Sequence, residues 1–373
     1  MKNHILFAFC LLITISANAQ VFTNKEVGKK NQELIDSLKV TDYPYSLPIW
    51  GDKATKKGYN LPYSAGVSVN YLWQESDIII DNLQVGFNNG PMYNLDQIVR
   101  FNKAVATSNT LSLRPDIWLF PFLNIYGIFG KTTASTDIGV GVWLDDPATG
   151  SETQITSFGT KVEFDATTFG LGMTPTIGVA GGFLALDMNV AWTDVPQLQK
   201  PAQTFIFGPR LGKNFKFGRP DQNIAVWVGG FRVQLKSETK GSLSLSEVFE
   251  GGDLKQKIDE GIAGVEQKRQ DLETWWTNLG PAGQANPINQ AKYNRADQIL
   301  DRAGEFLTAA DTAVNNISNS TVQYSMDKRP KDKWNFIIGS QYQYNKHWML
   351  RGEVGFLSSR TQALLSLQYR FGL

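Results

Sequence analysis

The last eleven residues, Ala363 to Leu373 (ALLSLQYRFGL), carry apolar or aromatic side chains at every second position. Ser366, Gln368 and Arg370 are among the residues between them. A period of two is typical of a β-strand whose two faces meet different surroundings. The segment therefore predicts a strand with one apolar and one polar face. Whether this strand belongs to a soluble sheet or lies in a membrane depends on the rest of the chain.

The first twenty residues (MKNHILFAFCLLITISANAQ) have the layout of a secretory signal peptide. Lys2 supplies the positive start, Ile5 to Ile15 form the apolar core, and Ala17 to Ala19 form a small-residue cleavage site. We predict cleavage after Ala19. The chain has one cysteine, Cys10, and cleavage would remove it. The exported protein would then be stabilised by its core, by a membrane or by both, without disulfides.

The composition fits a chain that crosses a membrane with strands. Aromatic residues make up 12% of the chain, which also has 34 glycines and 10 tryptophans. Beyond the signal, no run approaches eighteen consecutive apolar residues, so no transmembrane helix is expected. A strand buries only half of its residues in lipid, which agrees with the low mean hydropathy of −0.24. The net charge of +1 gives no support for nucleic acid as a partner.

Segments with the same alternation recur from Tyr63 onward. In one of them, Leu184 to Trp192 alternate with a polar face that includes Asp187. Charged residues on one face and bulky apolar ones on the other do not both fit the core of a soluble sandwich, whereas in a barrel they face lumen and lipid. Around Pro121 the pattern breaks, and two strands joined tightly at Pro121–Phe122 would explain it. Tryptophans near strand ends would form interfacial girdles; they are Trp73, Trp118, Trp143, Trp192, Trp334 and Trp348.

Together with the signal peptide and the terminal Tyr369, Phe371 and Leu373, this pattern resembles bacterial outer-membrane β-barrel proteins in general. The resemblance implies an all-β membrane barrel of antiparallel strands, about twelve in number within a range of ten to fourteen. The C-terminal strand would close it against the strand near Tyr63. The resemblance also implies the cell outer membrane of a Gram-negative bacterium, with outer-membrane lipid and the barrel-assembly machinery as partners.

The predicted barrel is interrupted once. Within 250–333, apolar residues recur at helical spacing on both sides of the stop Gly280–Gly283, and a second helix would open near Pro287. This predicts an inserted αα-hairpin. Counting strands back from the C-terminus puts it on the extracellular side. The expected domains are a signal peptide (1–19), an N-terminal periplasmic tail or plug (20–62), barrel strands (63–249), the helical insertion (250–333) and closing strands (334–373).

The sequence offers little for catalysis. After cleavage of the signal one histidine remains, His347, beside the predicted turn at Asn345–Lys346. No cluster of histidine and cysteine suited to a metal and no G-x-S-x-G motif is present. We therefore expect no catalytic residues, no metal, no cofactor and no enzymatic activity.

Binding is the remaining expectation. Two interpretations of the charged faces of the predicted strands stay open, a water-filled path for a solute and pairing across a narrow lumen. Trp275 and Trp276 are a candidate apolar binding surface, or pack inside the hairpin. The predicted lumen residues are Lys161, Glu163, Asp165, Asp187, Arg210, Arg232, Arg351, Glu353 and Arg370.

In outline the architecture is similar to the long-chain fatty acid transporter family, without a motif of that family. The expected function is a porin-like passive channel or transporter for a small molecule of unknown identity, hydrophobic molecules included. The alternative is a non-transporting surface protein with a binding or structural role.

Overall fold

The computed structural model describes residues 28–146, 150–196, 198, 200–236, 238–248 and 253–373. The predicted signal peptide, Met1 to Ala19, lies outside these residues, as does the predicted start of the insertion at Glu250. Among the described residues, no helix combines the length and the apolar character needed to cross a membrane.

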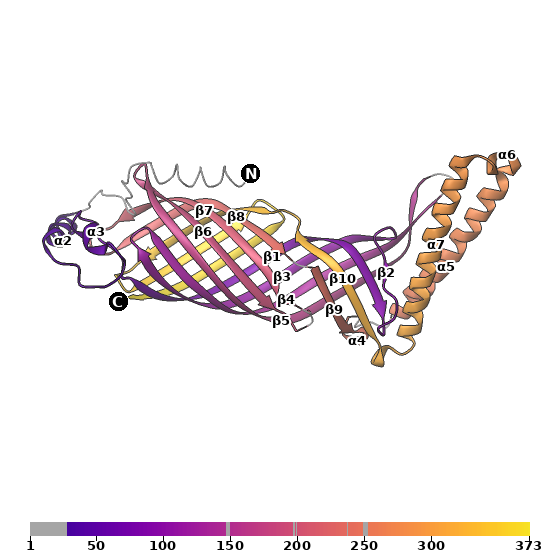
Figure 1. Ribbon diagram of the computed structural model, residues 1–373, viewed down its shortest axis with the longest axis horizontal. Helices are drawn as coiled ribbons and strands as arrows, with labels where there is room; N and C mark the ends of the chain where they lie inside the picture. The colour runs from indigo at the N-terminus through magenta and orange to yellow at the C-terminus, as the bar shows by residue number, and fades with distance from the viewer. Residues whose placement is uncertain (1–27, 147–149, 197, 199, 237, 249–252) are drawn as a thin grey trace.

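Ten strands of the described chain close into an antiparallel barrel, as the sequence predicted (Figure 1). The closing pair forms where it was expected, with Phe371 of the last strand opposite Ala65 of the first. In barrel order the strands are β1 (Ala65–Phe87), β3 (Val99–Phe120), β4 (Leu123–Asp145), β5 (Glu152–Val179), β6 (Gly182–Asp194), β7 (Ala202–Lys216), β8 (Asn223–Lys236), β11 (Trp334–Gln343), β12 (Trp348–Phe356) and β13 (Arg360–Phe371).

The favoured number of twelve strands was too high, although ten lies within the predicted range. The chain runs from β8 into β9 (Glu238–Ser244), and from β10 (Thr321–Pro330) into β11. β9 and β10 pair with each other beyond the barrel, and β10 also pairs with the distal part of β1. The insertion therefore sits at the tip of one long hairpin, and the strands that flank it add none to the ring. The short strand β2 (Tyr93–Asn94) pairs with β1.

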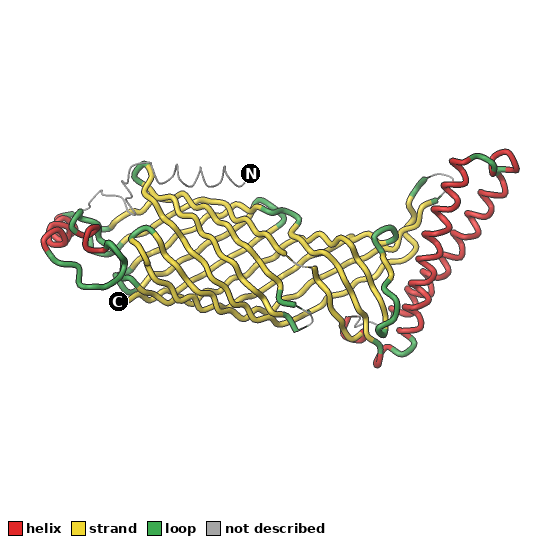
Figure 2. Tube along the Cα trace, viewed as in Figure 1, coloured by secondary structure: helices red, strands yellow, loops and turns green. Residues whose placement is uncertain are grey.

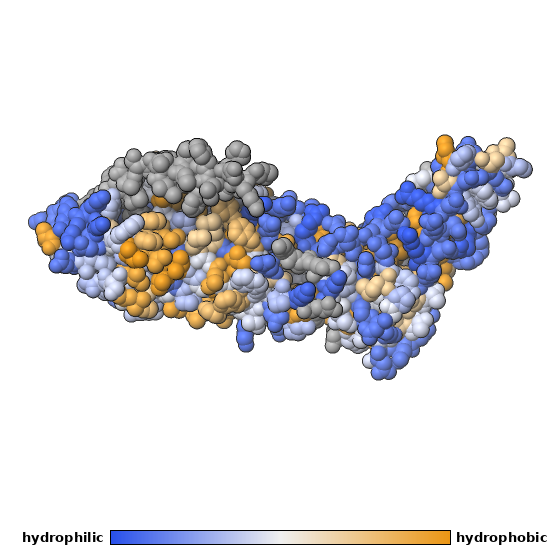
Figure 3. All heavy atoms as spheres, viewed as in Figure 1, coloured by the Kyte–Doolittle hydropathy of each residue, from blue (hydrophilic) through white to orange (hydrophobic). Residues whose placement is uncertain are grey.

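The barrel is apolar outside and polar inside. On β13, Leu365, Leu367 and Tyr369 are 56%, 49% and 41% exposed, whereas the alternating Ser366 and Arg370 are buried. Figure 3 shows apolar side chains gathered over the barrel strands on the visible face. Such a band, about 9–11 residues tall on each tilted strand, matches the hydrocarbon core of a bilayer.

Four strands are much longer than a membrane crossing requires. β1, β3, β4 and β5 have 23, 22, 23 and 28 residues, and about 10 residues suffice to cross. Their distal parts form, with β9 and β10, a wall that continues beyond the apolar band (Figure 2). We call this wall and the helices packed on it the distal unit.

The insertion folds as the predicted αα-hairpin and packs on the inner side of this wall. The predicted bounds of 250–333 were too wide, because Thr321–Pro330 form strand β10. Leu272 of the first long helix and Ala303 and Leu307 of the second are completely buried, together with Ile98 and Leu144 of the wall. The Asn286 side chain caps the second helix at Pro287, near the predicted start. The helical segments are α4 (Leu245–Val248), α5 (Leu254–Asn278), α6 (Gly280–Gln284), α7 (Pro287–Val314) and the 3-10 turn η1 (Ile317–Asn319).

The N-terminal segment lies across the opposite end of the barrel, where the chain also ends (Figure 1). It contains α2 (Lys29–Val40) and α3 (Gly51–Thr55). Asn31 donates to the backbone of Phe217 in the β7–β8 turn, and Asn60 donates to Asp221 in the same turn. The Ser46 N–H donates to the carbonyl of Leu373. The segment is thus docked on the barrel end by contacts with several turns.

Connections at this end are short. β3 and β4 join at Pro121–Phe122, as the sequence predicted, and β5 and β6 join at Ala180–Gly181. The longest described connection, the helical insertion, leaves from the other end. Bacterial outer-membrane barrels keep short turns on the periplasmic side and long connections outside.

Candidate functional site

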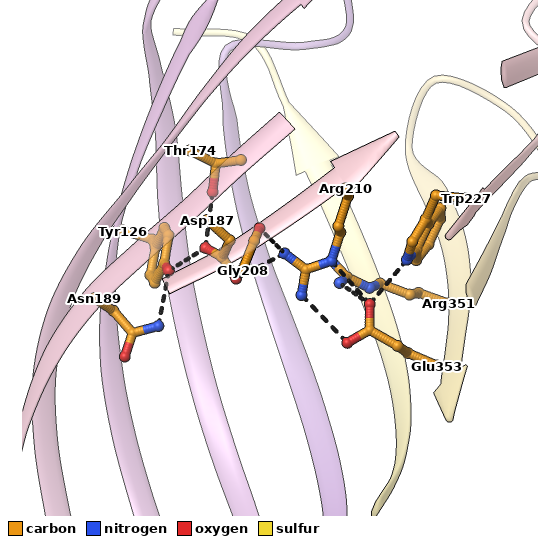
Figure 4. Close-up of polar contacts among 9 residues, drawn as sticks. All are labelled: Tyr126, Thr174, Asp187, Asn189, Gly208, Arg210, Trp227, Arg351 and Glu353. Atoms are coloured by element: carbon orange, nitrogen blue, oxygen red, sulfur yellow. Dashed lines mark hydrogen bonds and ion pairs between the residues drawn. The ribbon is translucent and has the colours of Figure 1, made fainter. Parts of the chain in front are cut away.

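The interior of the barrel holds a connected set of ionic side chains, centred on Arg210 of β7 (Figure 4). The Arg210 guanidinium lies 2.9 Å from Glu353 of β12 and 3.2 Å from Asp187 of β6. Glu353 also accepts hydrogen bonds from Arg351 at 3.0 Å and from the Trp227 indole at 2.9 Å. The set therefore reaches from β7 across β8 and β11 to β12.

The chain of contacts continues on the other side of Arg210. Asp187 accepts hydrogen bonds from Tyr126 of β4 at 2.5 Å and from Thr174 of β5 at 3.0 Å. The Arg114 guanidinium of β3 stacks 3.3 Å from the centre of the Tyr126 ring. Inward side chains of β3, β4, β5 and β6 are thus joined to those of β7 and β12.

A separate group of polar contacts, with its own ion pair, lies beside the barrel seam. Arg370 of β13 pairs with Asp116 of β3 at 2.9 Å and donates to the Tyr63 carbonyl at 2.9 Å. Asn124 and Gln368 donate to the two oxygens of Asp116, at 2.6 and 2.8 Å. We refer to both groups of contacts together as the interior network.

Apart from Arg351, which is 24% exposed, the ion-paired side chains of the interior network are almost inaccessible to solvent. Those of Asp116, Asp187, Arg210, Glu353 and Arg370 are 3–10% exposed. A water-filled channel would leave the side chains that line it accessible. The barrel at this level is therefore filled by its own paired side chains. Of the two open interpretations of the lumen charges, the geometry favours pairing.

Five of the nine predicted lumen residues lie inside. Asp187, Arg210, Arg351 and Glu353 meet in one cluster, and Arg370 pairs with Asp116 at the seam. The sequence singled out these five because they alternate with lipid-facing residues on strands that stay within the apolar band.

The prediction for Lys161, Glu163 and Asp165 was wrong. They lie on the outer face of β5, on the same side as the exposed Phe169, while Phe164 and Ala166 turn inward. These residues belong to the part of β5 that continues beyond the apolar band. There the outer face meets water, so the polar side points outward and the apolar side packs inside.

Arg232 was also misplaced. On β8 the exposed Val226 and Val228 mark the outer face, and Arg232 follows them with the same alternation. Its register partners on the neighbouring strands are Phe207 and Trp334. Arg232 thus stands on the outer face near the edge of the apolar band, where a polar residue no longer indicates the lumen.

Several interior residues were missed by the sequence analysis. Asp116 and Arg114 fall in the stretch around Pro121, where apolar residues on both faces hid the alternation. Tyr126 and Trp227 were not among the predicted lumen residues, although a buried phenol or indole needs a hydrogen-bond partner and each finds a carboxylate here. Alternation continued along the strand from Leu111 and Leu113, which face outward, would have placed Arg114 and Asp116 on the inner face.

Trp275 and Trp276 are half-buried within the helical hairpin. The Trp276 ring lies 4.7 Å from that of Tyr293 on α7, and Trp275 packs against the core of the distal unit. The Tyr293 hydroxyl donates to Glu273 at 2.6 Å, and this bond raises the pKa of Tyr293 to about 12. Of the two open interpretations, the contacts favour packing inside the hairpin.

His347 lies in the β11–β12 turn. Its Nδ1 is 2.8 Å from the Arg370 carbonyl, and its ring stacks on Tyr369. Among the described residues, no group of three or more histidine, cysteine, aspartate or glutamate side chains is arranged to hold a metal ion.

No protein-family model and no curated protein sequence matches the chain. Among solved structures, the chain is similar to the β domain of the Bordetella autotransporter BrkA, at 8% identity over 83% of this chain and 100% of that chain, with a TM-score of 0.34. It is also similar to the translocator domain of the autotransporter NalP from Neisseria meningitidis, at 9% identity over 86% and 93% of the two chains, with a TM-score of 0.31.

A third similar structure is an outer membrane channel from Pseudomonas putida F1, at 10% identity over 84% of this chain and 97% of that chain, with a TM-score of 0.28. Similarities with TM-scores this low carry no argument about the architecture of this chain. The closed order of the strands and the exposed apolar band define the architecture by themselves.

Proposed function

We propose that this protein is an outer-membrane barrel that is closed to solutes and presents the distal unit at the cell surface, in a binding or structural role. Its outer face carries the apolar band that lipid requires. The short turns and the chain end lie at one end of the barrel, and the distal unit lies at the other (Figure 1). This arrangement fits an extracellular distal unit.

The observation that carries this proposal is the burial of the interior network. Arg210 binds two carboxylates from different strands, and all three groups are nearly inaccessible. A solute of any size would have to break these ion pairs, and each broken pair would leave a buried charge without a partner. The N-terminal segment docked across the other end adds a second obstruction.

The test is ionic conductance of the purified full-length protein in planar lipid bilayers. We expect no steady channel from the wild-type protein. We also expect none when Leu254–Val314 is replaced by a short glycine-rich linker, because the obstruction lies in the barrel and not in the helices. A steady, reproducible conductance from the wild-type barrel would contradict the proposal and favour the channel function.

A matched variant shows whether the assay can detect an opening. In the double variant Arg210→Ala, Glu353→Ala one cation and one carboxylate of the cluster are removed together, so the net charge of the interior is unchanged while Asp187 and Arg351 lose these partners. We expect this variant to insert and to conduct more often than the wild type. Heat-modifiable migration on a gel serves as the check that both proteins are folded.

One observation favours a second candidate function, the capture of a small apolar molecule. A cleft of about 250 Å³ opens between the distal part of β1 and the start of β3. Five apolar residues line the cleft together with the polar Asp81, Asn82 and Asp96; the apolar ones are Ile80, Leu83, Leu95, Val99 and Phe101. Fluorescence titration of the wild type and of Val99→Trp with 1-anilinonaphthalene-8-sulfonate tests this second function. The larger side chain of the variant fills the cleft, so we expect saturable binding by the wild type and none by the variant.

We also propose that the protein is not an enzyme. His347 is engaged with the backbone of Arg370 and two aromatic rings in a turn. Among the described residues in contact with the His347 ring, no serine, threonine or cysteine is present to act as a nucleophile.

A further inference from the structure

Arg360, the first residue of β13, is buried inside the barrel with its guanidinium unpaired. The residue is 2% exposed, and it shares the inward face of β13 with Gln362 and Arg370. Two of its three nitrogens, Nε and Nη1, are buried and have no hydrogen-bond partner in the described chain. Because a guanidinium stays charged at any physiological pH, this is a buried positive charge without a visible counter-ion.

The carboxylates of the interior are already occupied. Among the described residues, the buried carboxylates are Asp116, Asp187 and Glu353. Asp116 pairs with Arg370, and the other two pair with Arg210. No carboxylate of this set is left over for Arg360.

The nearest acidic side chain outside the network is also engaged. Asp332, in the exposed connection before β11, accepts a hydrogen bond from the Ser359 N–H at 3.1 Å. It acts on Arg360 only through space, without an ion pair within 4.0 Å in the described chain. Its charge therefore does not satisfy the two buried nitrogens.

Two neighbours of Arg360 have unused hydrogen-bonding atoms as well. Asn335 Nδ2 on β11 and Gln362 Oε1 on β13 are buried and have no partner among the described residues. Both side chains lie over Gly355 of β12, where a Cβ atom would come within 2.7 Å of Asn335 Nδ2 and 2.6 Å of Gln362 Cγ. Ser358 Oγ donates to Asn335 Oδ1, which leaves the amide nitrogen of Asn335 as the free end.

The unpartnered atoms are thus mainly donors: two from Arg360, one amide nitrogen from Asn335 and a single acceptor from Gln362. A buried charge and buried donors are stable only when something accepts their hydrogen bonds. Water can accept hydrogen bonds, but it leaves the charge uncompensated. An anion does both.

We propose that the barrel binds one small monovalent anion, of the size of chloride or formate, between Arg360 and Asn335. Arg360 supplies the charge and two donors, and Asn335 supplies a third. The site lies inside the barrel wall, on strands β11, β12 and β13, and it does not involve the residues of the interior network. The anion site does not depend on whether the protein transports a solute, binds a partner or only presents the distal unit at the cell surface.

The first experiment is thermal unfolding of the full-length protein in detergent, with sodium chloride or sodium formate titrated against sodium gluconate at constant ionic strength. We expect a saturable rise of the midpoint with chloride and with formate, since a ligand that binds only the folded state stabilises it by mass action. Arg360→Met, which replaces the side chain by a shorter, unbranched apolar one without donors, should lose this dependence. Arg329→Met is the control, because Arg329 is exposed and pairs with Asp81 on the outside.

A second experiment does not depend on the folding of a variant. Crystals of the wild-type protein grown in sodium bromide should show an anomalous bromide peak within about 3.5 Å of the Arg360 guanidinium, the range of a charge-assisted hydrogen bond to a large anion. Ordered water at this place in bromide, or a midpoint that does not respond to chloride and formate in the wild type, would overturn the proposal. So would an equal response in Arg360→Met.

Discussion

The barrel within the apolar band and the distal unit beyond it share the strands β1, β3, β4 and β5, but the apolar and polar faces of these strands are exchanged between the two regions. Along β5, Phe169, Leu171 and Met173 point outward to lipid, while only a few residues earlier Lys161 and Glu163 occupy the same outer face. Inside, the barrel is filled by paired charges, whereas the distal unit is filled by a hydrocarbon core. The alternation of a strand persists, but its meaning reverses where the solvent outside changes from lipid to water.

The largest effect should come from the charged interior. Arg210→Met leaves Asp187 and Glu353 buried without their shared partner, and breaking a buried pair in this way costs about 3–5 kcal/mol. Urea-induced unfolding in lipid vesicles, followed by tryptophan fluorescence, measures the loss. Arg329→Met is the matched control, and its exposed pair with Asp81 should be worth no more than about 1 kcal/mol. Equal effects of the two variants would mean that the interior network contributes no more than a surface ion pair.

The distal unit should instead respond to loss of apolar volume. Leu307→Ala removes a fully buried side chain of α7 that lies against Gly261 of α5, and such a change costs about 2–5 kcal/mol. The loss should be confined to the helices, so hydrogen exchange of α5 and α7 should accelerate while that of β12 and β13 stays unchanged. Ile288→Ala, at a position 67% exposed, is the control. Faster exchange throughout the barrel would show that the two regions unfold as one.

A pair of substitutions on β5 tests the reversal directly. Met173→Arg places a charge on the outer face inside the apolar band, at a cost of about 2–4 kcal/mol near the bilayer midplane. Glu163→Arg, on the same face of the same strand, should change the free energy of unfolding by less than about 0.5 kcal/mol because its side chain meets water. Folding yield in vesicles and urea unfolding measure both. Comparable losses at the two positions would contradict the boundary drawn between them.

The smallest effect concerns the tip of the hairpin. The pKa of Tyr293 is raised to about 12 by its hydrogen bond to Glu273. The protonated phenol is therefore favoured in the folded state. Its stabilising contribution is complete below the ordinary value of about 10 and is lost as the pH rises from about 10 to 12. The difference in absorbance at alkaline pH between the wild type and Tyr293→Phe measures this titration. A difference titration centred near pH 10 would show that the bond to Glu273 is absent in solution.

Much of the barrel could be predicted from single strands. The alternation of Leu365, Tyr369 and Phe371 assigned both faces of β13, and that of Met188 and Asp187 assigned both faces of β6. The helical spacing around Leu272 and Leu307 identified the hairpin. These predictions succeeded because strand and helix periods are local properties that neighbouring elements do not alter.

The site was predicted only in part for the same reason. Local alternation separates two faces of a strand but does not say which of them is the inside. For Asp187 and Glu353 the apolar face met lipid, so the charged face was inside. For Lys161 and Asp165 the apolar face, with Phe164 and Ala166, turned inward, so the charged face was outside.

The sequence by itself determined that this chain forms amphipathic strands that close on one another, with a helical hairpin inserted near the end. Only the tertiary structure decided that ten strands make the ring, that Arg210 joins Asp187 and Glu353, and that Arg360 has no carboxylate partner in the part of the chain that the structure describes. The physical reason is that alternation depends on residues two apart, whereas these contacts join strands that lie far apart in the chain. Closure of the barrel brings those strands together, and it also sets the height at which lipid gives way to water.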